Sequence, residues 1–182
     1  MNNPTLEYIT KWEKELEKIN GDALIDYFHR FQTLYPIYNR LYTDANRIEN
    51  LNSKNQNRVS DYTMATIFVR DYLGSDTIIK ALEEQDQIKD VIAISKLIQN
   101  KVFHINLKDG NGQEKFDMEL VQKLLNEKDF SIRSRAVLSV IYNVRCNLVH
   151  GQKRLEEHQR LLLEPVQNLL RTIVSLMKDR LQ

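Results

Sequence analysis

Apolar residues recur every three to four positions along most of the chain, which is the spacing of amphipathic helices. Trp12, Leu16 and Ile19 share one face of a first helix, which the Asn-Gly pair at 20–21 should end. The segment 49–58 is polar and has no such spacing, so we expect an exposed loop there.

A long second helix is predicted from residue 22 to about residue 48. Pro36 lies inside this pattern, and we expect it to kink or interrupt the helix, because proline lacks an N–H donor and crowds the preceding turn. Tyr35, Tyr38 and Tyr42 could stack on nucleic-acid bases, but aromatic residues at helical spacing usually pack in a core. Core packing is therefore the interpretation we favour for these tyrosines.

The middle of the chain continues the helical pattern. It predicts helices over 60–73, from residue 75 or 76, over 88–103 and over 118–126. Gly74 should break the first of these. Between the last two, Asp-Gly and Asn-Gly pairs within 108–112 suit tight turns, so we expect a short loop or small hairpin near 104–117.

A late helix carries the most informative pattern. Asp129 or Ser131 suits its N-cap, and Gly151 suits its end. Its apolar face is formed by Val137, Ile141, Val144 and Leu148. A terminal helix is expected over 161–181, with Pro165 tolerated in its first turn.

Composition agrees with a helical fold. The 182 residues are 42% hydrophobic and 28% charged, which is typical of a globular protein, and only 5 glycines and 3 prolines are available for the turns of an all-β fold. We therefore predict an all-α protein, a single-domain up-and-down helical bundle over 1–182, with the short insertion near 104–117.

Charge and cysteine content exclude several classes of protein. The formal net charge of +1 does not indicate a membrane-surface protein or a general binder of nucleic acid, and no DNA partner is predicted. Cys146 is the single cysteine, so an internal disulfide or a thiolate metal site is not expected, and no cofactor motif is present. No membrane-spanning stretch or signal peptide is evident, so we expect a cytoplasmic protein.

Candidate chemistry lies at the end of the late helix, where Arg145 precedes His150 by five positions. The segment 131–154 contains no aspartate or glutamate, which suits a phosphate-bearing partner. Besides Arg145, its cations, which we expect to contact RNA, are Arg133, Arg135, Lys153 and Arg154.

An arginine and a histidine acting together suffice to cleave RNA without a metal. Arginine holds a phosphate through a fixed fork of donors, and histidine transfers protons near neutral pH. The two residues lie about 140° apart around the helix, at about 100° per residue. Arg145 could swing toward His150, or a second copy of the chain could complete the pair. The plain alternative is that Arg145 forms a surface ion pair and His150 caps the helix.

The segment 144–151, Val-Arg-Cys-Asn-Leu-Val-His-Gly, resembles the signature of the HEPN superfamily, in which Arg, four to six residues and His end a late helix of a helical bundle. Upstream, the segment 34–42, Leu-Tyr-Pro-Ile-Tyr-Asn-Arg-Leu-Tyr, resembles the aromatic Asn-x-Leu-Tyr end of that family's early long helix. A final amphipathic helix also agrees with the family.

The resemblance implies a homodimer with two Arg/His pairs facing one cleft, and a metal-independent endoribonuclease, often a toxin or antiviral effector. It makes Arg145 the phosphate-binding residue and His150 the acid/base. Many active members place Asn, Asp or His directly after the arginine, where this chain has Cys146, a weak donor. Asn143 and Asn147 are the alternatives for orienting the imidazole, so these two and Cys146 complete the supporting set.

Three hypotheses follow from the sequence. The first is a HEPN-like dimeric ribonuclease, with the setting of a toxin–antitoxin or phage-defence locus and an antitoxin protein as a further partner. The second is a catalytically inactive HEPN-like dimeric module that binds RNA, a nucleotide or a protein partner. The third is a plain scaffold with no affinity for RNA.

Overall fold

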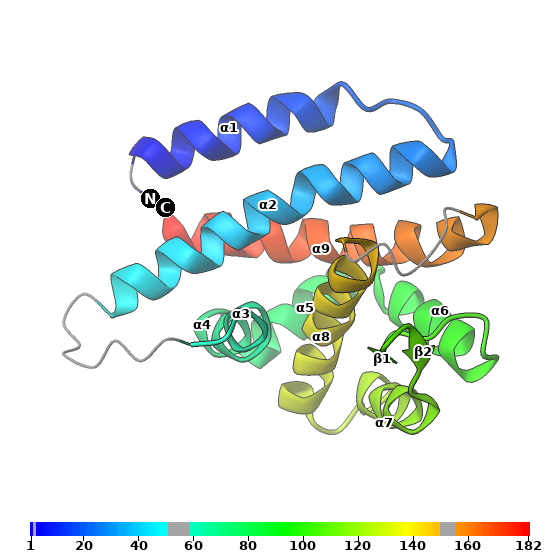
Figure 1. Ribbon diagram of the computed structural model, residues 1–182. Helices are drawn as coiled ribbons and strands as arrows, with labels where there is room; N and C mark the ends of the chain where they lie inside the picture. Colours follow the sequence, from blue (N-terminus) through cyan, green and yellow to red (C-terminus); the bar gives the residue numbers. More distant parts are fainter. Residues whose placement is uncertain (2, 51–58, 150–155) are drawn as a thin grey trace.

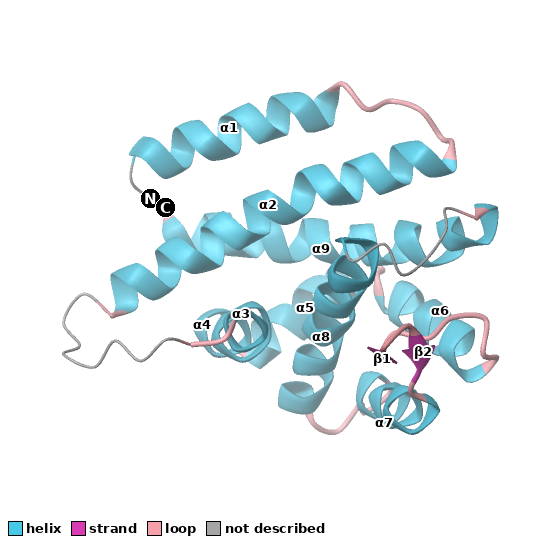
Figure 2. Ribbon diagram, in the orientation of Figure 1, coloured by secondary structure: helices cyan, strands magenta, loops and turns pink. Residues whose placement is uncertain are grey.

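The computed structural model describes residues 1, 3–50, 59–149 and 156–182. Within these ranges helices form almost all of the regular structure, and the strands make only a two-stranded hairpin (Figures 1 and 2). The all-α helical bundle predicted from the sequence is therefore confirmed. No helix in the described part of the chain is both long enough and apolar enough to cross a membrane.

Three long helices form one side of the molecule: α1 (Asn3–Glu17), α2 (Leu24–Glu49) and α9 (Arg160–Leu181). α1 and α2 lie side by side in opposite directions (Figure 1). α2 and α9 run in the same direction (Figure 1), and Arg160 at the start of α9 packs over the ring of Tyr27 near the start of α2. The end of α2 and the start of α9 lie at opposite ends of this helix pair, so a long connection must join them. Residues 50–159 form that connection.

Helix α2 continues through Pro36 without a break. Of the two outcomes expected at Pro36, a kink or an interruption, the interruption is therefore wrong. Phe31, Leu34, Ile37 and Leu41 are buried on both sides of the proline, so packing against the core holds the two halves in one helix.

The segment predicted as a helix over 60–73 is helical but not uniform. It consists of α3 (Asp61–Thr63), a π-helical turn (Met64–Phe68) and α4 (Val69–Leu73). The wider turn is visible in the bond from the Val69 N–H to the Met64 carbonyl. Gly74, at φ 86°, then ends α4 as predicted.

Two short helices and a hairpin follow. The helices are α5 (Ser75–Glu84) and α6 (Ile88–Gln99). Strands β1 (Leu107–Lys108) and β2 (Asn111–Gly112) are antiparallel and are joined by Asp109 and Gly110. Both of these loop residues have positive φ, at 51° and 78°, which is the backbone of a two-residue type I′ turn. Of the short loop or small hairpin expected here, the structure shows the small hairpin.

Helix α7 (Glu114–Leu124) begins four residues before the expected start at 118. Its first turn contains Glu114 and Asp117, and carboxylates are favourable at the positive end of a helix. The charged residues at this start conceal the helical pattern, which shows clearly only from Leu120 onward, where Leu120, Val121 and Leu124 are buried.

Helix α8 (Phe130–Val149) crosses in front of α9 and leads toward α2 (Figure 1). The Asp129 carboxylate accepts the N–H of Ile132 at 3.0 Å, so Asp129 is the N-cap. Val137, Ile141 and Val144 are buried as predicted. They join one hydrophobic cluster to which all the longer helices contribute. A 3₁₀ turn (Glu157–Gln159) precedes α9.

The tyrosines of α2 pack in this core. Tyr35, Tyr38 and Tyr42 are 4%, 0% and 2% exposed, and neighbouring rings meet edge to face at centroid distances of 5.7 and 5.0 Å. The prediction that they are core residues is confirmed.

Arg133 requires a correction. Its place in the acid-free segment 131–154 predicts RNA contact, but it is only 4% exposed, and its Nε donates to the Leu124 carbonyl at 3.1 Å. The bond ties the first turns of α8 to the end of α7. Arg133 is therefore a structural residue, whereas Arg135 is exposed.

Arg133 and Arg135 make a matched pair for a stability test. We expect Arg133→Ala to lower the free energy of unfolding by about 2 kcal/mol, because it removes buried side-chain packing and a charged hydrogen bond. Arg135→Ala should change it by less than about 0.5 kcal/mol, as is usual for an exposed side chain. Urea denaturation followed by circular dichroism measures both, and equal values for the two variants would contradict the assignment.

Candidate functional site

The end of α8 positions the candidate residues. Val144 is buried, and the residues that follow it, Arg145, Cys146 and Asn147, are half-buried on the sides of the helix. His150, Lys153 and Arg154 lie outside the described residues, so their part in the site stays a prediction.

Arg145 points toward α2. Its guanidinium carbon lies 5.5 Å from the centroid of the Tyr35 ring, within range of a cation–π contact. Its Nη1 is 4.0 Å from the sulfur of Cys146. Among the described residues, none of the ion pairs includes Arg145.

Arg145 borders a cavity of about 420 Å³ between α8, α1 and α2, here called the Arg145 cavity. Its other lining residues are Tyr8, Gln32, Tyr35, Pro36, Asn39, Arg40 and Thr43. Asn39 and Arg40 belong to the α2 segment singled out in the sequence, and Arg145 belongs to the late-helix segment. The structure therefore brings residues of the two segments into one cavity.

Arg40 is more fully engaged than Arg145. Its Nε lies 3.6 Å from a carboxylate oxygen of Asp44, and its guanidinium donates to the hydroxyl of Thr5 at 2.9 and 3.0 Å. Thr5 and Asp44 are both buried, so these contacts tie α1 to α2. Arg145, which has no carboxylate partner in the described part of the chain, is the better candidate in this cavity for an anionic ligand.

Asp61 is an acidic residue near the site that the sequence analysis missed. It accepts a hydrogen bond from the Tyr42 hydroxyl at 2.6 Å. Partial burial by itself lowers the pKa of Arg145, but Cys146, Tyr35 and Asp61 outweigh it and raise that pKa above its usual value. Arg145 therefore stays charged. Asp61 and Arg145 are far apart in the sequence, and Asp61 follows a polar segment, so no local pattern indicated that they lie close together.

The supporting residues Asn143, Cys146 and Asn147 do not line the Arg145 cavity. They line a separate cavity of about 320 Å³ beside the hairpin, here called the hairpin cavity. Its other lining residues are Ile105, Asn106, Leu107, Lys108, Gln113 and Phe116. The two asparagine amides are already bonded: Asn143 donates to Asn106 Oδ1 at 3.2 Å, and Asn147 donates to the Ile105 carbonyl at 3.1 Å.

Asp117 holds Asn106 in place for this contact. Its buried carboxylate accepts the Ile105 and Asn106 N–H groups at 3.2 and 2.9 Å, and the Asn106 side-chain amide at 2.9 Å. It also pairs with Nδ1 of His104 at 2.8 Å. Sequence reasoning missed Asp117, because an aspartate in a polar stretch usually lies at the surface.

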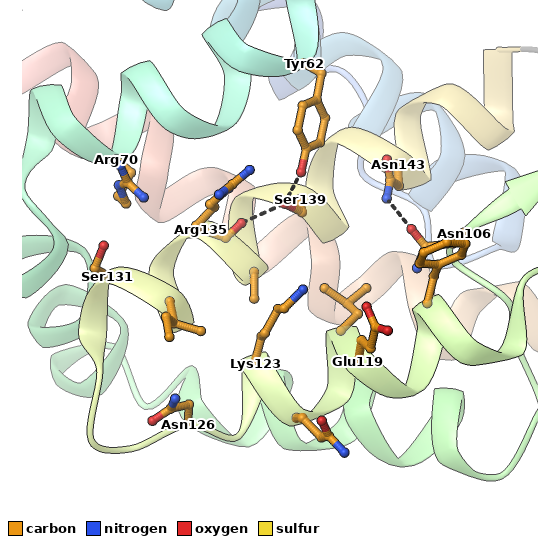
Figure 3. Close-up of a pocket in the computed structure, with 15 residues that line it drawn as sticks. Tyr62, Arg70, Asn106, Glu119, Lys123, Asn126, Ser131, Arg135, Ser139 and Asn143 are labelled. Atoms are coloured by element: carbon orange, nitrogen blue, oxygen red, sulfur yellow. Dashed lines mark hydrogen bonds between the residues drawn. The ribbon is translucent and has the colours of Figure 1, made fainter.

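Arg135 borders a third concavity, of about 480 Å³, between α7 and α8, here called the α7–α8 groove (Figure 3). Lys123 extends into it from α7, and Arg70 of α4 lies at its rim (Figure 3). Of the four cations assigned to RNA contact, Arg135 alone is described and surface-exposed. Lys123 and Arg70 were missed, since neither is near the late-helix segment in sequence.

The donor chemistry of the described residues gives no metal site: they contain no group of three or more His, Cys, Asp or Glu side chains placed to hold a metal ion.

Comparisons of this chain with models of protein families, with curated protein sequences and with solved structures give no significant match.

Tyr142 provides a direct test of the Cys146 environment. Partial burial and a side-chain hydrogen bond with Cys146 raise the pKa of Tyr142 to about 12. In the unfolded chain a tyrosine titrates near pH 10, so the stabilising contribution is complete below about pH 10 and is lost as the pH rises toward the folded pKa. We expect Cys146→Ala to lower the pKa of Tyr142, whereas Cys146→Ser should keep it raised. NMR titration of ¹³Cζ-labelled tyrosine, assigned with Tyr142→Phe, measures the pKa.

The same titration of the wild-type protein can contradict this assignment. A Tyr142 signal that titrates near pH 10, as in a free tyrosine, would place this side chain outside the environment described.

Proposed function

We propose that this chain is a metal-independent endoribonuclease of the HEPN type that acts as a homodimer, with Arg145 and His150 as its catalytic pair. The observation that supports it most is the meeting of two segments at the Arg145 cavity. Both segments were singled out for their resemblance to one family, and a chance likeness of two short motifs does not require them to share a cavity.

The chemistry assigned to Arg145 fits its surroundings. It is half-buried and lacks a carboxylate partner among the described residues, and its pKa is raised. A guanidinium in such a position has no ion pair to break and little hydration to lose when it binds a phosphate. It can bind the phosphate through two parallel N–H donors. The face of Tyr35 supports the guanidinium from one side and limits its motion.

In the proposed reaction, the ribose 2′-oxygen attacks the adjacent phosphorus as His150 removes its proton. Arg145 stabilises the negative charge that develops on the phosphoryl oxygens. The bond from phosphorus to the 5′-oxygen breaks, and that oxygen takes up a proton, so the products carry a 2′,3′-cyclic phosphate and a 5′-hydroxyl. No metal enters any of these steps.

The proposed biological setting is the cytoplasm, as a toxin or phage-defence effector with an antitoxin protein as a further partner. A basic segment around the site suits RNA, since Lys153 and Arg154 follow His150 directly in the sequence.

A second candidate function is an inactive module that keeps the fold and binds RNA, a nucleotide or a protein partner. One observation favours it: Asn143 and Asn147 are bonded to the segment before the hairpin. Cys146 is then the remaining group of the supporting set to orient the imidazole, and a thiol is a weak donor.

Cleavage of total RNA in the presence of a chelator tests the proposal. We expect the wild-type protein to leave cyclic phosphate ends. Arg145→Ala should reduce the rate roughly 100-fold or more through loss of charge stabilisation, and His150→Ala should reduce it by about 100- to 10,000-fold through loss of proton transfer. Gel electrophoresis with end-group analysis of the fragments measures both effects.

His29→Ala and Arg47→Ala are matched controls, because both residues are exposed and border neither cavity. They should cleave at the wild-type rate. Cleavage that requires added Mg²⁺ would overturn the proposal, and RNA binding that survives His150→Ala without cleavage by any form would select the inactive module.

A further inference from the structure

The α7–α8 groove has the charge of an anion-binding surface. Arg135 and Lys123 are exposed and form no ion pair with the described residues. The guanidinium of Arg70 pairs with Asp71 at 2.6 Å, and Asp71 does not line the groove. Glu119 is the one acidic residue among its lining side chains. A nearly neutral protein therefore carries a local excess of positive charge here, and this attracts a phosphate-bearing ligand.

Aromatic rings and side-chain amides also line the groove, beside its cations. Phe116 is 54% exposed, which is unusual for so large an apolar ring. Tyr62 lies over α8 with its hydroxyl 3.1 Å from that of Ser139 (Figure 3). The amides of Asn106 and Asn143 are held in fixed positions by their mutual bond (Figure 3). Aromatic faces and fixed amides beside cations are the features that bind unpaired bases.

The groove does not end at Asn143. Asn106, Phe116 and Asn143 line both the groove and the hairpin cavity, so the two adjoin at these residues along α8 and are here together called the channel. From Ser131 to Asn147 the helix rises about 24 Å at about 1.5 Å per residue, which exceeds the length of one nucleotide. The hairpin-cavity end of the channel is lined by Cys146 and Asn147, which directly follow Arg145 near the end of α8.

We propose that this channel binds single-stranded RNA and guides it to the end of α8. Arg135 and Lys123, with Arg70 at the rim, contact backbone phosphates, and Phe116 stacks on a base at the junction with the hairpin cavity. Stacking on an exposed ring requires an unpaired base, which selects a single strand over a duplex. The choice of RNA rests on the proposed function, whereas the path along α8 rests on the residues of the channel.

Binding is best measured in the His150→Ala background, so that cleavage does not affect the readout. Fluorescence anisotropy of a short labelled single-stranded RNA is followed over a range of salt concentrations. We expect the double variant Lys123→Ala with Arg135→Ala to bind at least ten-fold more weakly and to lower the log–log salt slope by about 1.4, at about 0.7 for each phosphate contact. Phe116→Ala should weaken binding by roughly ten-fold with little change in the slope, because it removes stacking and no charge.

The matched control for charge is the double variant Lys11→Ala with Lys80→Ala. These lysines are exposed on α1 and α5 and do not line the channel. The control removes the same charge and should change both affinity and slope much less. Leu6→Ala is the apolar control for Phe116, since Leu6 is 52% exposed on α1.

The outcomes separate this proposal from the nuclease. Equal loss of binding in the channel and control double variants, equal affinity for a duplex, or no binding of RNA at all would overturn the channel. Cleavage by the wild type together with binding indifferent to channel variants would leave the nuclease and remove the channel. Binding that depends on the channel, with no cleavage by the wild type, would support the channel and remove the nuclease.

Discussion

Val137, Ile141 and Val144 are buried in the core, and their burial fixes the rotation of α8 about its own axis. Because successive residues are turned by about 100°, this constraint decides which surface each polar residue of the helix meets. Arg145 is directed to α2, whereas Asn143 is directed to the hairpin. A shift of one residue in this packing would turn each side chain by about 100° and direct both away from these surfaces. The candidate chemistry therefore depends on apolar packing that takes no part in it.

A second constraint fixes the other wall of the channel. The carboxylate of Asp117 binds two successive backbone N–H groups and the side chain of Asn106, and it thereby joins the start of α7 to the segment before the hairpin. A buried carboxylate with several donors is costly to disturb, since any one donor left unpaired loses its hydrogen bond away from water. The position of Asn106, and through it that of Asn143, is thus set by a group that never reaches the surface of the channel.

The sequence predicted the elements that depend on local signals. Asp129 caps α8, Gly74 ends α4, and Asp109-Gly110 makes the hairpin turn, because each depends on the backbone preferences of one or two residues. It could not separate Arg133 from Arg135, since both lie on one helix and only tertiary packing determines which arginine is covered. Groups from distant segments, such as Lys123 beside Arg135, were missed for the same reason: their proximity is a property of the fold.

The division of α8 between two surfaces bears on how the proposed catalytic pair is completed. By sequence spacing, His150 belongs to the face of Asn143, which borders the hairpin cavity, while Arg145 borders the cavity next to α2. A pair within one chain would require the guanidinium to leave the ring of Tyr35 and pass around the helix. In the proposed homodimer, a pair formed between two copies would require neither movement if the second copy presented its imidazole to the Arg145 cavity. Of the two arrangements that the sequence left open, the contacts of Arg145 therefore favour, for the proposed homodimer, the one between protomers.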